Sequence, residues 1–153
     1  MHPAAGAKFK VHTVSEGVVY QDADVRVTAF NVDHRPVEPA FGYKFEAGGK
    51  TVAISGDTRP SENLIRFARG ADVLVLEAYL PEHFDRVDTP EVAARLKRYH
   101  TSAEEAGQMA QQAGVKLLVL SHLIPANAEP TFLERAGKHF NGRIVVGRDL
   151  MRF

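Results

Sequence analysis

The sequence predicts a mixed α/β domain in which antiparallel strands come first and helices alternate with strands afterwards. Up to Phe45, apolar and polar residues alternate in short runs, as they do in half-buried strands. After Asp57, apolar runs of the buried-strand type alternate with segments of helical spacing, which is the pattern of strands joined by crossover helices. We therefore expect a mixed sheet with its helices packed on one face. It should form a single domain over residues 1–153, with a disordered stretch at residues 1–7.

The first elements are all strands. Alternating or β-branched residues predict strands over three ranges, Phe9–Val14, Gly17–Tyr20 and Val25–Phe30. A hairpin then joins Phe41–Glu46 to Thr51–Ile54, because the pair Gly48-Gly49 between them favours a tight turn.

Helices appear after Asp57. Ser61 is suited to cap a helix that Gly70 ends, and a buried strand follows over Ala71–Glu77. We expect a loop over Pro81–Pro90. The remaining predictions are helices over Glu91–Tyr99, Ala103–Ala113 (capped by Thr101 or Ser102) and Glu129–Phe140, and strands over Leu117–His122 and Arg143–Gly147.

Composition narrows the classes of function. A chain of 153 residues, 44% hydrophobic and 25% charged, can bury a real core as one domain. Nineteen basic residues against nineteen acidic ones give no overall attraction to nucleic acid, which stays possible as a partner through a local patch. The absence of cysteine excludes disulfides, Cys-ligated zinc and a thiolate nucleophile. No apolar run is long enough for a membrane helix, so we expect a cytoplasmic protein without a membrane partner.

Two polar side chains lie at the carboxyl ends of buried-type strands. Asp57 comes after Thr51–Ile54, in a turn that contains Gly56, and His122 is the last residue of the predicted strand Leu117–His122. Open α/β sheets keep their sites at the carboxyl ends of strands, and a carboxylate with a neutral imidazole suits zinc or manganese. The pair suggests a shared metal or hydrolytic centre. The alternatives are a capping or Asx-turn carboxylate for Asp57 and a hydrogen-bonded histidine at a strand end for His122.

Three strings, taken in order, resemble the carboxyl-terminal half of the metallo-β-lactamase superfamily, closest to its ribonuclease Z and arylsulfatase-like branch. They are Ser-Gly-Asp-Thr-Arg-Pro-Ser-Glu-Asn-Leu at 55–64, His-Thr-Ser-Ala-Glu-Glu-Ala-Gly at 100–107 and Leu-Val-Leu-Ser-His-Leu at 118–123. The resemblance implies one half of the family's αββα sandwich. It also implies two zinc or manganese ions bridged by Asp57, with His122 completing the ligand shell of one of them.

Four further residues acquire candidate roles. In the ribonuclease Z branch the histidine of a His-Ser/Thr-Thr/Ser motif is the proton donor, and His100 would take that part; its alternative is an exposed residue before a helix. Glu77 ends an apolar strand, and a buried carboxylate is costly unless it is paired, so we expect it to hydrogen-bond an imidazole or a backbone group. His100 is a candidate partner, which Glu77 would orient. His34 and Arg59 would contact substrate; the alternatives are a turn residue before Pro36 and an ordinary exposed arginine.

The family binds its metals mainly through a His-x-His-x-Asp-His motif in its amino-terminal half, and none of the seven histidines here lies two residues from another. A catalytic zinc takes about three protein ligands, so we expect an incomplete site and an isolated chain that is inactive. Three explanations stay open: a fragment of a longer hydrolase, a natural half completed by a partner chain, and a degenerate module. A half-sandwich exposes a sheet edge and an apolar face, which predicts a dimer or higher oligomer.

The leading hypothesis is a metal-dependent hydrolase of phosphodiester or sulfate-ester bonds, in which His100 protonates the leaving group. A second is phosphoryl transfer through an aspartyl phosphate on Asp57. It is disfavoured because such folds carry further acidic residues for Mg²⁺ after the first strand. A third is a metal-free interaction module that binds another chain through its open face.

Overall fold

The computed structural model describes residues 11–87 and 89–152. Its strands are β1 (Gly17–Gln21), β2 (Val25–Asn31), β3 (Phe41–Ala47), β4 (Lys50–Ile54), β5 (Val73–Tyr79), β6 (Leu117–Ile124) and β7 (Arg143–Val146). Its helices are α1 (Glu62–Ala68), α2 (Pro81–Val87), α3 (Pro90–Lys97), α4 (Ala103–Ala113) and α5 (Glu129–Gly137).

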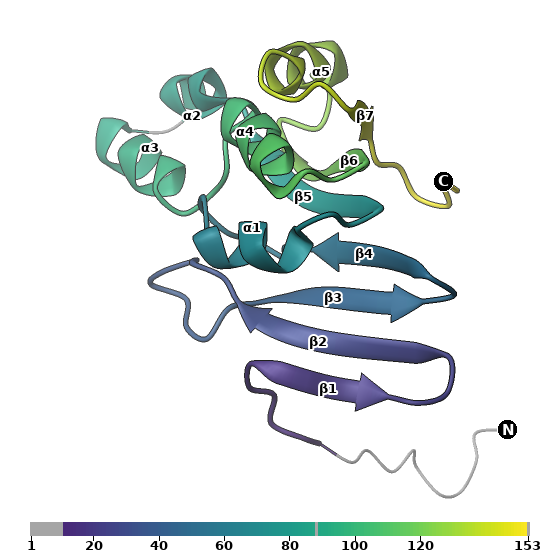
Figure 1. The fold of residues 1–153 in the computed structure, drawn as a ribbon. Coiled ribbons are helices and arrows are strands. Elements are labelled where there is room, and N and C mark those ends of the chain that lie inside the picture. Colours follow the sequence, from purple (N-terminus) through teal and green to yellow (C-terminus); the bar gives the residue numbers. More distant parts are fainter. Residues whose placement is uncertain (1–10, 88, 153) are drawn as a thin grey trace, which may run out of the picture.

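The strands form one seven-stranded sheet whose order follows the chain, from β1 at one edge to β7 at the other (Figure 1). Neighbours from β1 to β4 are antiparallel, whereas β4, β5, β6 and β7 run parallel to one another. This arrangement confirms the predicted mixed sheet. It also places the carboxyl ends of β4, β5 and β6 side by side, along the edge of the sheet where these parallel strands end.

Local sequence signals account for most of the elements. Gly48 and Gly49 have positive φ and form the turn between β3 and β4. The Ser61 hydroxyl accepts the Leu64 N–H at the start of α1. Ser102, rather than Thr101, caps α4 in a capping box with Glu105.

Two predicted segments differ from the structure. The strand over Phe9–Val14 is wrong for its described part, because residues 11–14 join no ladder and β1 pairs with β2 alone. Residues 9 and 10, like the predicted disorder at 1–7, lie outside the described residues. The loop over Pro81–Pro90 instead holds the short helix α2, where Phe84 packs in a small cluster with Tyr79 and Ala93. That packing is tertiary, so local propensity does not reveal it.

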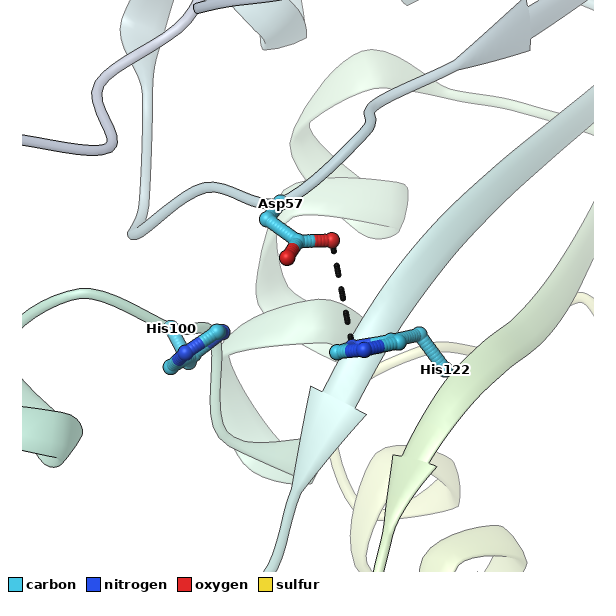
Figure 2. Close-up of side chains that lie close together, drawn as sticks. All are labelled: Asp57, His100 and His122. Atoms are coloured by element: carbon cyan, nitrogen blue, oxygen red, sulfur yellow. Dashed lines mark ion pairs between the residues drawn. The ribbon is translucent and has the colours of Figure 1, made fainter. Parts of the chain in front are cut away.

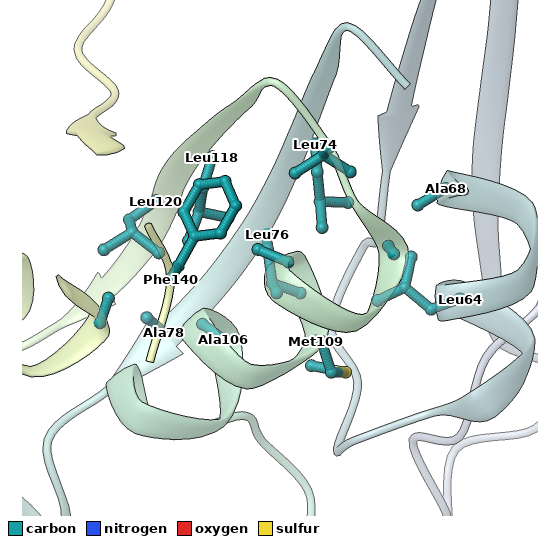
Figure 3. Packing of buried hydrophobic residues seen from close by; sticks show 14 of the residues in the cluster. Leu64, Ala68, Leu74, Leu76, Ala78, Ala106, Met109, Leu118, Leu120 and Phe140 are labelled. Atoms are coloured by element: carbon teal, nitrogen blue, oxygen red, sulfur yellow. The ribbon is translucent and has the colours of Figure 1, made fainter. Parts of the chain in front are cut away.

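The main core lies between the helices and one face of the sheet. Ala53, Leu74 and Leu118 are partners across β4, β5 and β6, so their side chains point to the same face. All three are buried in one cluster with Leu64 of α1 and Ala106 of α4 (Figure 3). Among the described residues, no helix is both long and apolar enough to cross a membrane.

The opposite face carries two apolar rows that run across the sheet. The strand register aligns Val27, Phe45, Val52, Val73 and Leu117 in one row, and Ala29, Tyr43, Ile54, Val75, Val119 and Val145 in the other. The exposed fraction of Ile54 is 38%, and Val52, Val73 and Val75 are only half-buried. Apolar area on this face is therefore left in contact with solvent.

Helices α4 and α5 approach each other closely at Gly107. A Cβ atom at Gly107 would clash with the backbone carbonyl of Ala136, whereas a Cβ at Gly137 would meet its nearest neighbour, Ile144, at 4.0 Å. We expect Gly107→Ala to lower the free energy of unfolding by about 1–3 kcal/mol, because two helix backbones must move apart. Urea denaturation followed by circular dichroism measures this change.

Gly137→Ala is the matched control, since it makes the same substitution in α5. It should leave stability unchanged or raise it by up to about 1 kcal/mol, because alanine favours a helix more than glycine does. Equal stabilities for the two variants would contradict the close approach at Gly107.

Candidate metal centre

Asp57 is exposed by a tight turn that follows β4. Ser55 still hydrogen-bonds to Val75 of β5, at 3.0 Å, and Gly56 then turns the chain with φ of 64°. A Cβ atom on Gly56 would lie 3.0 Å from the carbonyl oxygen of Phe41, so the turn needs a residue without a side chain. The Asp57 carboxylate is thereby presented at the edge where the parallel strands end.

The sequence analysis predicted that His122 ends its strand, and that prediction is wrong. Strand β6 continues to Ile124, and the register between β5 and β6 shifts where His122 lies, opposite Glu77 and Ala78. His122 has φ of 45°, and its side chain is 53% exposed. A β-bulge leaves one residue unpaired and re-aims its side chain, which explains how a residue inside a strand reaches the site.

Asp57, His100 and His122 come together in space (Figure 2). Each offers one ligand atom, and the three atoms lie within 4.8 Å of one another. His122 Nδ1 is 3.8 Å from Asp57 Oδ1. One carboxylate and two imidazoles suit zinc or manganese. Among residues 11–87 and 89–152, no group donates a hydrogen bond to the Asp57 carboxylate, so its oxygens are available to a metal ion. The donor set therefore fits a metal ion.

The carboxylate of Glu77 lies beneath this group and is only 1% exposed. Its Oε2 accepts a hydrogen bond from Nδ1–H of His100 at 2.6 Å, and its Oε1 accepts the backbone N–H of Thr58. The predicted pairing of Glu77 with His100 is confirmed. Because the His100 side chain is only 11% exposed, the alternative of an exposed residue before a helix is wrong.

The pair influences the protonation of both partners. The hydrogen bond to the Glu77 carboxylate raises the pKa of His100. Burial raises the pKa of Glu77, and the hydrogen bond from His100 opposes that effect. Since Nδ1–H of His100 is held by Glu77, Nε2 is the ring nitrogen left for proton exchange with another group.

Two buried threonines that sequence reasoning did not assign to the site hold it together. The Thr101 hydroxyl donates to the carbonyl of Thr58 at 2.6 Å, and the carbonyl of Thr101 accepts the N–H of Tyr79 at 2.9 Å. Thr101 thus ties the loop that carries His100 to both the Asp57 turn and the end of β5. Its position directly after His100 in the string at 100–107 is the available signal, although a threonine before a helix also predicts a cap.

His34 joins the cluster from the loop between β2 and β3. Its Nδ1–H donates to the carbonyl of Tyr99 at 2.9 Å, and its ring centroid is 5.2 Å from that of His100. Arg59 points instead to Asp33, with Nη2 2.6 Å from Oδ2. The guanidinium groups of Arg35 and Arg59 hold the pKa of Asp33 well below its usual range.

The sequence of this chain matches a known protein family and individual members of it. The model of the beta-lactamase superfamily domain matches residues 2–123. The chain belongs to the metallo-β-lactamase superfamily. It is 35% identical over 146 residues to a ribonuclease Z from Mycobacterium tuberculosis (strain H37Rv), covering 94% of this chain and 53% of that protein. The chain therefore spans about half the length of such curated relatives.

Solved structures show the same fold. The metallo-β-lactamase fold protein YhfI from Bacillus subtilis aligns with a TM-score of 0.67 and 23% identity, over 84% of this chain and 49% of that one. Zinc-bound PqqB from Methylobacterium extorquens aligns with a TM-score of 0.61 and 20% identity, over 90% and 50%. In both, the alignment uses about half of the larger protein.

The hydrogen bonds of Glu77 predict a large effect of truncation. Glu77→Ala should lower the free energy of unfolding by about 2 kcal/mol or more, because the Thr58 N–H and the His100 Nδ1–H lose their buried acceptor. Glu77→Gln should lower it less, since its carbonyl oxygen still accepts one of these bonds. Glu46→Ala, which truncates a glutamate on β3 whose side chain is 39% exposed, is the control and should change stability by no more than about 0.5 kcal/mol.

Denaturant titration measures all three variants of this series, and nitrogen NMR of the imidazole ring reports which nitrogen of His100 carries the proton. If Glu77→Ala is as stable as the wild-type chain and the tautomer of His100 is unchanged, the buried hydrogen bond between Glu77 and His100 is contradicted.

Proposed function

We propose that this chain contributes half of a dinuclear metal centre that hydrolyses phosphodiester bonds. The observation that carries the proposal is the convergence of Asp57, His100 and His122 above the buried Glu77 carboxylate. Similarity to proteins named ribonuclease Z supports a phosphodiester as the bond that is cleaved. The sulfate-ester alternative has no comparable support.

Asp57 and His122 would hold the metal. A carboxylate has two oxygens and can bridge two cations, and a neutral imidazole binds zinc or manganese well. Bound there, two such ions would polarise the phosphodiester and lower the pKa of the attacking water.

His100 has the features of a general acid, and we assign it that role rather than the role of a ligand. Glu77 fixes its ring through Nδ1–H, which leaves Nε2 to deliver a proton to the leaving oxygen. The same hydrogen bond raises the pKa of His100, which favours the proton-carrying form before the transfer. His34, 5.2 Å from His100 between ring centroids, stands where it can contact the substrate beside the reacting phosphate.

The remaining metal ligands must come from another segment or chain. A site for two metals needs more ligands than Asp57 and His122, and this sequence has no His-x-His-x-Asp-His. The two apolar rows on the open face of the sheet fit a second sheet packed face to face. We propose that an amino-terminal half of the family fold covers this face, and that a second copy covers it when that half is absent.

A fusion of this chain to the amino-terminal half of the Mycobacterium tuberculosis relative tests the activity. With Zn²⁺ or Mn²⁺ it should hydrolyse bis(p-nitrophenyl) phosphate, and EDTA should abolish the reaction. Asp57→Asn and His122→Asn should lose bound metal, as measured by mass spectrometry. His100→Asn should keep its metal but lose about 100-fold or more in kcat, as expected for a missing general acid.

His139→Asn, at an exposed position after α5, is the control and should retain full activity. A fusion that binds two metals but does not cleave phosphodiesters would overturn the proposed reaction. Tight binding of two zinc ions by the 153-residue chain alone would overturn the half-site.

Self-association of the isolated chain tests the proposed use of the open face. Ile54→Lys places a charge in the middle of one apolar row, so it should shift the chain from oligomer to monomer in sedimentation velocity. Val11→Lys is the control, because Val11 is 88% exposed and lies outside the sheet. A wild-type chain that is monomeric at high concentration would contradict this use of the face.

A further inference from the structure

Arginine side chains gather in a pocket next to the candidate metal centre. The pocket is lined by Arg35, Arg59, Arg95 and Arg98, together with Pro36, Glu91, Ala94 and Tyr99. These residues come from three separate parts of the chain: the loop between β2 and β3, the turn after β4, and helix α3 with the residues that follow it. A role in stabilising one helix end would explain Arg95 and Arg98, but not the arginines that arrive from two loops.

The pocket and the candidate metal centre share a wall. Arg35 follows His34 in the chain, and Tyr99 precedes His100. The hydrogen bond from His34 Nδ1–H to the carbonyl of Tyr99, at 2.9 Å, joins these two segments. Arg59 is two residues from Asp57. A ligand in the pocket therefore lies beside a phosphodiester bound at the candidate metal centre and does not displace it.

The charges in the pocket are unbalanced. Arg35 and Arg59 share the carboxylate of Asp33, because Nη2 of each lies 2.6 Å from its Oδ2, and Nε of Arg35 also lies 3.8 Å from Oε1 of Glu38. Arg95 and Arg98 form no ion pair with any residue in the described ranges 11–87 and 89–152, and Glu91 is the carboxylate that lines the pocket with them. The pocket thus has a local positive excess, although the chain as a whole has a formal charge of zero.

We propose that this pocket binds a phosphate of a single-stranded nucleic acid, next to the phosphodiester that is cleaved. The planar guanidinium group matches the geometry of a phosphate, and Arg95 and Arg98 lie one helical turn apart, so both can reach one phosphate. Tyr99 offers an aromatic ring on which a base can stack. A molecule that reaches both the pocket and the metal centre needs two phosphates in series, which a polynucleotide strand supplies.

The position of the cleaved bond in this proposal rests on the proposed function, but the binding does not. Binding is therefore tested in EDTA, without metal, by the fluorescence anisotropy of a labelled single-stranded RNA oligonucleotide over a range of salt concentrations. The double variant Arg95→Gln/Arg98→Gln is compared with Arg26→Gln/Arg143→Gln. The control also removes two positive charges, but from exposed positions on β2 and β7 that lie outside the pocket.

The pocket variant should bind more weakly than the control, and its dependence on salt should be smaller. Losing the contact to this one phosphate lowers the slope of log affinity against log salt by about 0.7, so the affinity lost between about 50 and about 200 mM salt should differ by about 2.6-fold. Glu91→Gln removes the opposing carboxylate, so it should bind the oligonucleotide more tightly than the wild-type chain. Unchanged thermal unfolding in all variants shows that the fold is kept.

Equal affinity and equal slope for the pocket variant and the control would overturn the proposal, even if the fused enzyme cleaves phosphodiesters. Inorganic phosphate that competes at the same concentration as the oligonucleotide would also overturn it, because the pocket would then be a site for free phosphate. Conversely, pocket-dependent binding by a chain whose fused form cleaves no phosphodiester would leave this site standing and refute the proposed function.

Discussion

The candidate site depends on the hydrogen bonds that the buried carboxylate of Glu77 accepts from Thr58 and His100. A carboxylate that is 1% exposed is tolerated only when its oxygens are hydrogen-bonded, and here each oxygen has a donor from a different loop. One donor is the backbone of Thr58, directly after Asp57, and the other is the imidazole of His100. The cost of burying the charge is offset only when both loops are in place, so one residue sets the position of two parts of the site.

The sheet topology makes this arrangement reachable. Parallel pairing of β4, β5 and β6 brings Asp57, Glu77 and His122 to one edge, although they are far apart in the chain. The bulge in β6 then aims His122 at Asp57, and Thr101 ties the His100 loop to the same edge. The backbone thus supplies the approximate positions of these groups, and a few buried polar contacts fix their orientation.

Two surfaces beside the site have different physical characters. The open sheet face is apolar, which favours contact with another protein surface, whereas the pocket between α3 and the His34 loop is basic. A chain of zero net charge has no long-range attraction to a polyanion, so any such binding depends on the local excess of arginine.

The sequence by itself determined the features whose physical causes lie within a few residues. The predicted bounds of α4 were correct because Ser102 and Gly114 cap it locally, and the β3–β4 hairpin followed from Gly48 and Gly49. Asp57 and His122 were candidates because each lies at the carboxyl end of a buried-type strand, and His100 became one because its string resembles a known family. Tertiary structure alone decided the extension of β6 through the bulge at His122, the helix α2 that packs Phe84, and the burial of Thr101. Each depends on partners elsewhere in the chain, as Thr101 depends on Thr58, 43 residues away, and local propensity contains no information about such pairs.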